Sequence, residues 1–368
     1  MDQVINLTRL LTNKTTLAQN RIDAVSLPTQ LEDGEVILAI KRIAITTNNI
    51  TYAAFGEAMQ YWGFFPTGDA AWGHMPVWGF AEVLASKAPG VEAGELFYGY
   101  FPVASHIRME AVRISERGFY DGSAHRRDLV SAYNQYTRCS HDSAYRKEQE
   151  NYQMLVRPLF ITSFMAADFL QDNQFFGARQ IIVSSASSKT AYGTAWCLKD
   201  KYDVKLIGLT SENNRAFVES LGCYDETLSY EELEQLDSSV PTLYLDFSGN
   251  DKLRASIHHH FGEALTYDCY AGSAQNTAFL QKAALPGPEP KLYFAPIQIR
   301  KRNIDWGHDI VNQRFNEAQA AFIARISVPG SEWMKVEEHA GFPAALELIA
   351  DMHAGRIDPR LGHVVVVT

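Results

Sequence analysis

The chain has 368 residues, long enough for two domains of ordinary size, and its 46% hydrophobic and 21% charged residues are typical of a soluble globular protein. Lys plus Arg number 33 and Asp plus Glu number 43, so the formal net charge at pH 7 is −10. This acidic balance argues against binding to nucleic acid or to an anionic membrane, because both require a basic surface.

The cysteines and the apolar segments indicate the compartment. The four cysteines lie far apart, with no CxxC pair, as is typical of free thiols in a reducing compartment rather than of disulfides or a structural zinc site. No stretch of about 18 uninterrupted apolar residues occurs, and no basic region leads into an apolar run near the start. We therefore expect a cytoplasmic protein without a signal peptide or a membrane-spanning helix.

Short β patterns separated by glycine and proline dominate the first part of the chain. Strands are predicted over 35–45, 76–84 and 95–101, a pattern typical of a small, curved β barrel or sandwich. Between 53 and 75 lies a loop rich in aromatic side chains, which either fills a core or walls a pocket for a flat, apolar ligand. Residues 115–153 are polar and irregular.

The pattern changes after a helix predicted over about 155–170. Strands are then predicted over 180–184, 204–209, 224–228, 242–246 and 265–270, alternating with helices over 190–201, 212–221, 231–236 and 251–261. This alternation predicts a parallel sheet with helices on both faces. A proline-rich stretch over 285–290 ends it, and helices over about 312–325 and 342–353 and a strand over 361–368 follow.

The turn after the first strand of this parallel sheet, 184–191, is where a dinucleotide's pyrophosphate binds in doubly wound folds. It lacks the glycines of the usual fingerprint, although small residues stand at the three spaced positions. The hydroxyl and backbone N–H groups of Ser185, Ser188 and Thr190 can still bind phosphate, and Lys189 adds a positive charge. The alternative is a serine-rich turn that only caps the following helix.

The second strand of the sheet ends at Thr210 and Ser211, and Arg215 follows one helical turn later. An arginine near this strand end accommodates the 2′-phosphate of NADP, whereas NAD enzymes usually carry a carboxylate there. The segment therefore favours NADPH, although Glu212 supplies a carboxylate that fits equally well in the first helical turn. The alternative for Arg215 is a solvated charge on the helix surface.

Two later strands end in small residues at the same carboxyl edge of the sheet. Ser248 and Gly249 follow the fourth strand, and Gly272 and Ser273 follow the fifth. We expect these residues to contact the nicotinamide ribose, because ligands of doubly wound sheets bind at this edge.

Several loose motifs occur in a specific order, at 34–41, 45–52, 76–84 with 94–99, and 206–211 with 219–225. In this order they resemble the medium-chain dehydrogenase/reductase superfamily over nearly the whole chain. The resemblance implies an α/β protein with a GroES-like β domain over 1–153 and a Rossmann domain over 154–295. It also implies a C-terminal segment over 296–368 that returns to the first domain, and a homodimer.

The chain departs from the zinc-dependent branch of that superfamily. The branch carries a Cys-His pair where this chain has Asn49 to Tyr52, and a Gly-His-Glu where this chain has Val77-Trp78-Gly79. No catalytic or structural zinc site is therefore expected. The chain resembles the zinc-free quinone and enone reductases, which use NADPH. The serine-rich turn and the segment 157–163 also look like a branch whose members have no settled function.

The resemblance places Tyr52 at an active-site tyrosine of the quinone reductases. Reduction of an enone leaves negative charge on the carbonyl oxygen and requires a proton at the α-carbon, and Tyr52 is the candidate for either task. Asn49 is a candidate for orienting substrate or ribose. The alternative for Tyr52 is a core tyrosine with a satisfied hydroxyl group.

Another candidate metal motif is His258 to His260, but consecutive histidines on a helix point in different directions and cannot converge on one ion. We expect them to be exposed.

These observations predict a zinc-independent, NADPH-dependent oxidoreductase that reduces an activated C=C or carbonyl group of a small-molecule substrate. Because the phosphate turn lacks glycines and a fold does not settle function, two alternatives stay open. One is a nonredox enzyme on the same scaffold, such as a lyase or a retro-aldol enzyme. The other is a noncatalytic protein that binds a nucleotide or a partner.

Overall fold

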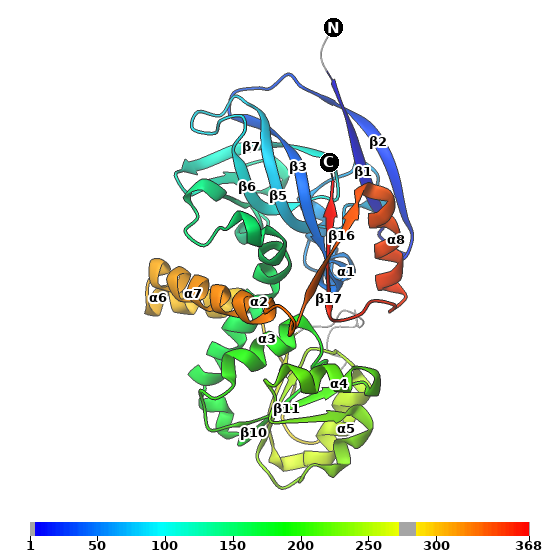
Figure 1. The fold of residues 1–368 in the computed structure, drawn as a ribbon, viewed down its shortest axis with the longest axis vertical. Coiled ribbons are helices and arrows are strands. Elements are labelled where there is room, and N and C mark those ends of the chain that lie inside the picture. The colour runs from blue at the N-terminus through cyan, green and yellow to red at the C-terminus, as the bar shows by residue number, and fades with distance from the viewer. Residues whose placement is uncertain (1–3, 272–284, 368) are drawn as a thin grey trace. The chain divides into compact units, whose positions relative to one another are not determined.

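The structure is a computed structural model that describes residues 4–271 and 285–367 (Figure 1). Contacts within the chain divide it into two compact units. The first contains Met1–Leu155 and Lys335–Thr368, and the second contains Val156–Met334. The three functional domains predicted from the sequence stay a prediction, because compactness alone does not assign a function to each part.

A closed β sheet is the centre of the first unit. The strand order β16-β17-β3-β5-β6-β9-β8-β7 is closed by an additional antiparallel pairing of β7 with β3, so the strands from β3 to β7 form a barrel. The strands are β3 (Glu35–Ile45), β5 (Val77–Ser86), β6 (Leu96–Phe101), β7 (His106–Ser115), β8 (Gly118–Asp121), β9 (Gln135–Arg138), β16 (Lys335–Ala340) and β17 (Leu361–Val366). The barrel predicted from the β patterns is confirmed.

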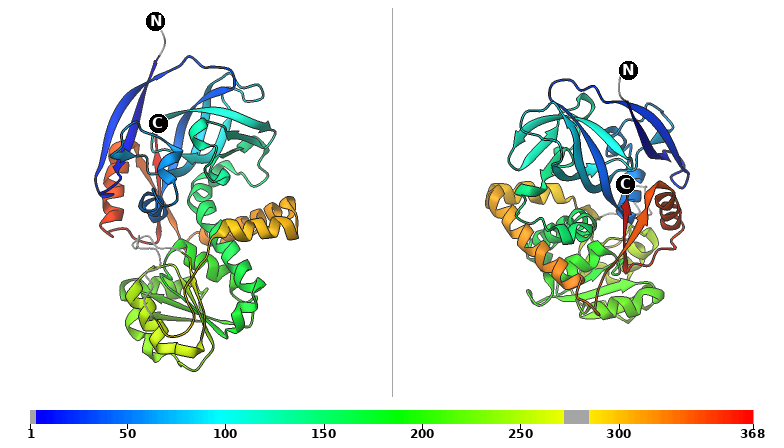
Figure 2. Two further views of the ribbon diagram at one scale, coloured as in Figure 1. Left: turned by 180° about the vertical axis from the view of Figure 1, so that it is seen from behind. Right: turned by 45° about the horizontal axis from the view of Figure 1, so that its top comes forward.

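A second sheet in this unit joins β1 (Val4–Asn13) to β2 (Asn20–Pro28) and to β4 (Trp72–Gly73). Helix α8 (Gly341–His353) lies beside β1 and β2, as both views of Figure 2 show. Its apolar side, with Phe342, Leu348 and Ile349, is buried in the same core as the barrel strands. The chain after residue 335 thus completes the core of the first unit.

The aromatic loop contains a helix that the sequence did not predict. Helix α1 (Thr47–Ala54) begins at Thr46, whose backbone N–H donates to Asn49 Oδ1 at 2.6 Å in a capping box. A short 3₁₀ helix, Tyr61–Phe64, follows. The aromatic side chains of this region pack into a buried cluster made of Tyr52, Phe55, Tyr61, Phe64, Phe65 and Tyr100. Of the two interpretations of the loop at 53–75, core filling is confirmed for its members Phe55, Tyr61, Phe64 and Phe65.

The second unit is built on a parallel sheet (Figure 1). Among the described residues its strand order is β12-β11-β10-β13-β14-β15, and every neighbouring pair is parallel. The strands are β10 (Gln180–Val183), β11 (Lys205–Thr210), β12 (Glu226–Ser229), β13 (Thr242–Asp246), β14 (Leu265–Tyr270) and β15 (Lys291–Leu292). The helices between them are α3 (Lys189–Leu198), α4 (Glu212–Leu221) and α5 (Asp251–Phe261), with a 3₁₀ helix over Tyr230–Gln235. The predicted parallel sheet is confirmed.

Three further helices precede or follow the strands of this sheet along the chain. Helix α2 (Glu150–Asp172) precedes it, while α6 (Ala295–Asp305) and α7 (His308–Ile326) follow it. Phe160 of α2 stacks on Phe322 of α7 with ring centroids 4.5 Å apart, so α7 packs on α2. Within residues 4–271 and 285–367, none of the helices is both long enough and apolar enough to cross a membrane.

Candidate functional site

The strand order of the second unit reverses between β10 and β13, which are neighbours although two strands separate them in the sequence. Ligands of doubly wound sheets bind at the carboxyl ends of the strands where this reversal occurs. The turn after β10 begins at Ser184, and the loop after β13 runs from Phe247 to Asn250. These two segments therefore form the candidate site.

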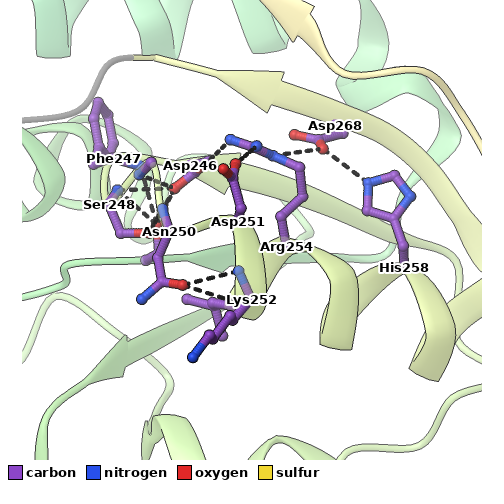
Figure 3. A network of polar contacts seen from close by, with 12 residues as sticks. Asp246, Phe247, Ser248, Asn250, Asp251, Lys252, Arg254, His258 and Asp268 are labelled. Carbon is purple, nitrogen blue, oxygen red and sulfur yellow. Dashed lines mark hydrogen bonds and ion pairs between the residues drawn. The ribbon is translucent and has the colours of Figure 1, made fainter. Parts of the chain in front are cut away.

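A buried carboxylate ties the two segments together. Asp246 ends β13, and its Oδ1 accepts hydrogen bonds from the hydroxyls of Ser184 and Ser248, both at 2.8 Å. The same oxygen accepts from the backbone N–H groups of Ser248 at 2.8 Å and Gly249 at 2.9 Å (Figure 3). The Ser184 hydroxyl in turn accepts from the N–H groups of Phe247 at 3.0 Å and Ser248 at 3.1 Å. Asp246 thus fixes the loop that holds Ser248 and Gly249.

Arg254 balances the charge of Asp246. Its Nη2 donates to Asp246 Oδ2 at 2.6 Å, its Nη1 donates to Asp251 Oδ1 at 2.8 Å, and its Nε lies 3.4 Å from Asp268 Oδ2 (Figure 3). Arg254, Asp246 and Asp268 are all buried, whereas the Asp251 side chain is half exposed. The side chain of Asn250 caps the N-terminus of α5. Arg254 lies one turn further along the helix and faces Asp246 at the end of β13.

His258 continues this network one turn further along α5. Its Nε2 lies 2.8 Å from Asp268 Oδ2, and its Nδ1 lies 2.8 Å from the carbonyl oxygen of Pro286. The carbonyl oxygen of Pro286 can only accept a hydrogen bond, so Nδ1 is the donor in that contact. Burial is the main cause of a raised Asp268 pKa. The expectation that His258 is exposed is wrong, since it is fully buried on the inner face of α5.

The turn between β10 and α3 is organised by side chains. Ser185 has a positive φ of 49°, and its N–H donates to the Tyr230 hydroxyl at 3.2 Å. Ser188 is the N-cap of α3, where its hydroxyl accepts from the N–H of Ala191 at 3.3 Å. Lys189 is the first residue of α3. The capping role foreseen for this turn is therefore real, and a phosphate role for Ser185, Ser188, Lys189 and Thr190 stays a prediction.

The predicted 2′-phosphate residues lie at the end of the neighbouring strand β11. Thr210 is buried, and Ser211 occupies the N-cap position of α4. Three carboxylates surround the guanidinium of Arg215: Glu232 at 2.8 Å, Glu219 at 3.1 Å and Glu212 at 3.7 Å. Arg215 is thus an ion-paired side chain, and a 2′-phosphate here would have to compete with these carboxylates.

The structure brings most of the predicted cofactor residues to one edge. The ends of β11, β10 and β13 are adjacent, so 185–190, 210–215 and 248–249 lie at the carboxyl edge of three neighbouring strands. Gly272 and Ser273 lie outside the described residues. Ser184, Asp246 and Arg254 were not predicted as site residues from the sequence. The available signal was an acidic residue ending the apolar strand 242–246, followed eight residues later by an arginine on the predicted helix.

Tyr52 belongs to the first unit and lies within the aromatic cluster. Its hydroxyl accepts from Trp78 Nε1 at 3.3 Å, and its ring centroid is 4.8 Å from that of Tyr61 and 5.5 Å from that of Tyr100. The hydroxyls of Tyr61 and Tyr133 lie 3.1 Å apart beside it. Burial raises the pKa of Tyr52 far above its ordinary value. Tyr52 is therefore a neutral phenol at any physiological pH.

Asn49 has both ends of its side chain engaged within the first unit. Its Oδ1 accepts from the N–H of Thr46, and its Nδ2 donates to the carbonyl of Pro76 at 2.8 Å. The residue is 2% exposed. These contacts fix the start of α1 against the segment that enters β5, and thereby fix the backbone that carries Tyr52.

The barrel of the first unit and the parallel sheet of the second unit give the α/β fold that the resemblance implied, and solved structures share this fold. A family model described as "Protein of unknown function (DUF2855)" matches residues 43–358, and the chain belongs to that family. A comparison with curated proteins gave no match.

Solved structures with this fold match nearly the whole chain at low sequence identity. CurA from Vibrio vulnificus in complex with NADPH is 14% identical, with a TM-score of 0.61 over 98% of this chain and 99% of that chain. The yhdH oxidoreductase from Salmonella enterica in complex with NADP is 14% identical, with a TM-score of 0.54 over 98% and 100%. A mutant of Etr1p in complex with NADP and crotonyl-CoA is 11% identical, with a TM-score of 0.55 over 99% and 100%.

The network around Asp246 yields a stability prediction. Asp246→Asn removes the buried charge that faces Arg254 and puts an amide donor among donors. We expect it to lower the free energy of unfolding by about 3 kcal/mol or more, because breaking a buried ion pair leaves its partner uncompensated. Urea denaturation of the purified protein measures this change.

The matched control for that measurement is Asp251→Asn. It removes the half-exposed carboxylate of the same arginine, and a surface pair contributes less than about 1 kcal/mol. Equal losses for the two variants would contradict the central role of the Asp246 carboxylate.

Proposed function

We propose that this protein is a zinc-independent, NADPH-dependent oxidoreductase that reduces an activated C=C or carbonyl group of a small molecule, as in an enone, a quinone or an enoyl thioester. The observation that carries the proposal is the pair of ordered loops after β10 and β13, at the reversal of the strand order. The NADPH and NADP complexes of CurA and yhdH, and the crotonyl-CoA complex of Etr1p, support it. A homodimer remains part of the proposal.

The residues present fit a dinucleotide at its pyrophosphate. The N-terminal turn of α3 offers backbone N–H groups, Lys189 adds a positive charge, and the turn over 184–188 contains no carboxylate. Ser248 and Gly249 would contact the nicotinamide ribose, and Thr210, Ser211 and Arg215 the adenosine ribose and its 2′-phosphate. When bound, the nicotinamide supplies a hydride for the β-carbon of the substrate.

Tyr52 would act on the carbonyl oxygen of the substrate. A phenol whose pKa is raised by burial keeps its proton, so it is better suited to donate a hydrogen bond to the developing oxyanion than to transfer a proton to carbon. Asn49 would act as a positioning residue, since its amide holds the start of the helix that carries Tyr52. No cysteine or histidine stands at 49–52, so this segment offers no zinc ligand of the kind that the zinc-dependent branch uses.

Cofactor binding is the primary test. We expect NADPH at micromolar concentration to raise the melting temperature of the protein, with a smaller effect of NADH, because a ligand that binds the folded state stabilises it. Thermal-shift and fluorescence titrations measure both. If neither nucleotide shifts the melting temperature, the redox proposal is wrong, and a nonredox or noncatalytic function takes its place.

Two variants test the preference for NADPH. Arg215→Gln removes the charge that would bind the 2′-phosphate, and we expect NADPH affinity to fall about tenfold while NADH affinity holds. Glu232→Gln removes a competing carboxylate but keeps an acceptor for the N–H of Ser229, and we expect tighter NADPH binding. Equal effects on NADPH and NADH in either variant would show that Arg215 does not read the 2′-phosphate.

A third experiment tests Tyr52 as an oxyanion donor. With a cyclic enone, a naphthoquinone and crotonyl-CoA as probes, we expect Tyr52→Phe to lower kcat by about 10²- to 10³-fold, as the loss of one oxyanion donor does. NADPH affinity should not change. Tyr61→Phe is the matched control, because it removes another hydroxyl of the same aromatic cluster. A Tyr52→Phe variant with full activity would exclude this role.

A further inference from the structure

Three potential metal ligands lie together on the strands β16 and β17 of the first unit. Glu337 and His339 are two residues apart on β16, so their side chains leave the same face of the sheet. His363 on β17 lies directly opposite Glu337 in the parallel register. His363 is also paired with Ile45 at the end of β3, immediately before Thr46, where α1 begins.

The donor atoms of these three side chains converge. His339 Nε2 lies 3.0 Å from His363 Nδ1, Glu337 Oε2 lies 3.5 Å from the same nitrogen, and all three atoms lie within 4.8 Å of one another. Two ligands bound at about 2.1 Å to a tetrahedral or octahedral ion are roughly 3.0 to 3.4 Å apart. The separation of the two imidazole nitrogens therefore fits a shared ion, and the separation from the carboxylate oxygen is only slightly longer. Rotation of the exposed Glu337 carboxylate adjusts the separations in which it takes part.

A hydrogen bond between the two imidazoles explains this geometry less completely than a shared cation does. His363 Nδ1 can carry one hydrogen, yet it faces both a ring nitrogen and a carboxylate oxygen, and one hydrogen cannot be directed well at both. A cation satisfies the three lone pairs at once. The neighbouring Glu338 is not part of the set, since its carboxylate accepts from Arg42 at 2.6 Å and from Asn151 at 2.8 Å.

We propose that Glu337, His339 and His363 bind a divalent first-row transition-metal ion, for which Zn²⁺ is the natural probe. Two imidazoles and one carboxylate form a donor set that suits such ions, whereas Mg²⁺ and Ca²⁺ prefer oxygen ligands throughout. His363 is 4% exposed, His339 is half-buried and Glu337 is exposed, so the set opens toward solvent on the β16 side. Water or a small ligand completes the coordination there.

The ion would tie an edge strand to its neighbour. β16 is the last strand of the sheet order, and two of the ligands come from it while the third comes from β17. The site is separate from 49–52 and 77–79, the positions that the resemblance assigns to a catalytic zinc. No zinc site was expected from the sequence because the motifs of the zinc-dependent branch are missing, and the three ligands proposed here belong to none of those motifs. The proposal is therefore independent of the proposed redox function.

Direct metal binding by untagged, chelator-treated protein tests the proposal. We expect the wild type to bind one equivalent of Zn²⁺ by calorimetry, and Co²⁺ in its place to give visible bands typical of nitrogen and oxygen ligands. Glu337→Gln and His339→Ala should each weaken binding at least about tenfold, since even the loss of an outer-shell partner costs about 10- to 100-fold. Zn²⁺ should also raise the melting temperature of the wild type more than that of either variant.

The choice of variants keeps the test decisive. Both alter side chains that are exposed or half-buried, so the fold is retained without relying on the buried His363. His141→Ala is the matched control, because it removes an exposed histidine of the same unit whose ring contacts Ser140. Equal Zn²⁺ affinity in the wild type and both variants, or no binding below millimolar concentration, would overturn the site. Preference for Mg²⁺ or Ca²⁺ would overturn the assigned class of ion.

Discussion

The candidate site depends on the interactions of one buried carboxylate, that of Asp246. A charge with no access to water is tolerated only when it is paired and hydrogen-bonded, and Asp246 meets both conditions through Arg254 and through four donors on Oδ1. Those donors come from the turn after β10 and from the loop after β13. The requirement to satisfy one charge therefore fixes both segments at the place where the strand order reverses.

Buried charged groups that are paired and hydrogen-bonded also continue from the edge of the sheet into the core of the second unit. Two buried acids, Asp246 and Asp268, face Arg254 and His258 on one side of α5. These contacts form only while α5 keeps its register against β13 and β14, because Arg254 and His258 are one turn apart on the helix. The network therefore positions α5, and through its N-terminal residue Asp251 the loop at 247–250, more strictly than apolar contacts alone would.

In the first unit, the corresponding constraint is that the Tyr52 hydroxyl group is held inside an aromatic cluster. Asn49 fixes the start of α1 through two hydrogen bonds, and the rings of Tyr61 and Tyr100 pack around Tyr52. Burial raises the pKa of Tyr52 and keeps it neutral, which is consistent with the hydrogen-bond donation proposed for it. A rigid backbone and a raised pKa thus favour the proposed donor role among the two tasks predicted for Tyr52.

The fold was largely predictable because its signals are local. The strands β3, β13 and β14 and the helices α4 and α5 have the predicted bounds, since each combines apolar periodicity with clear end signals. The site was less predictable because its interactions are long-range. Ser184 and Asp246 are 62 residues apart, and nothing in either neighbourhood indicates their hydrogen bond. The prediction for His258 was wrong for the same reason, since its partner Asp268 lies on the separate strand β14.

The serine-rich turn after β10 shows how the first turn of such a sheet can be ordered without the usual glycines. Glycine serves such turns by adopting positive φ and by allowing close approach of the backbone. Here Ser185 adopts the positive φ itself, at a cost that its N–H bond to Tyr230 helps to offset. Ser184 contributes the bridge to Asp246 that a glycine could not make, and Ser188 caps α3. In this turn, side-chain hydrogen bonds fix the backbone that glycine would leave free to move. A bound phosphate would therefore meet a surface that is already ordered.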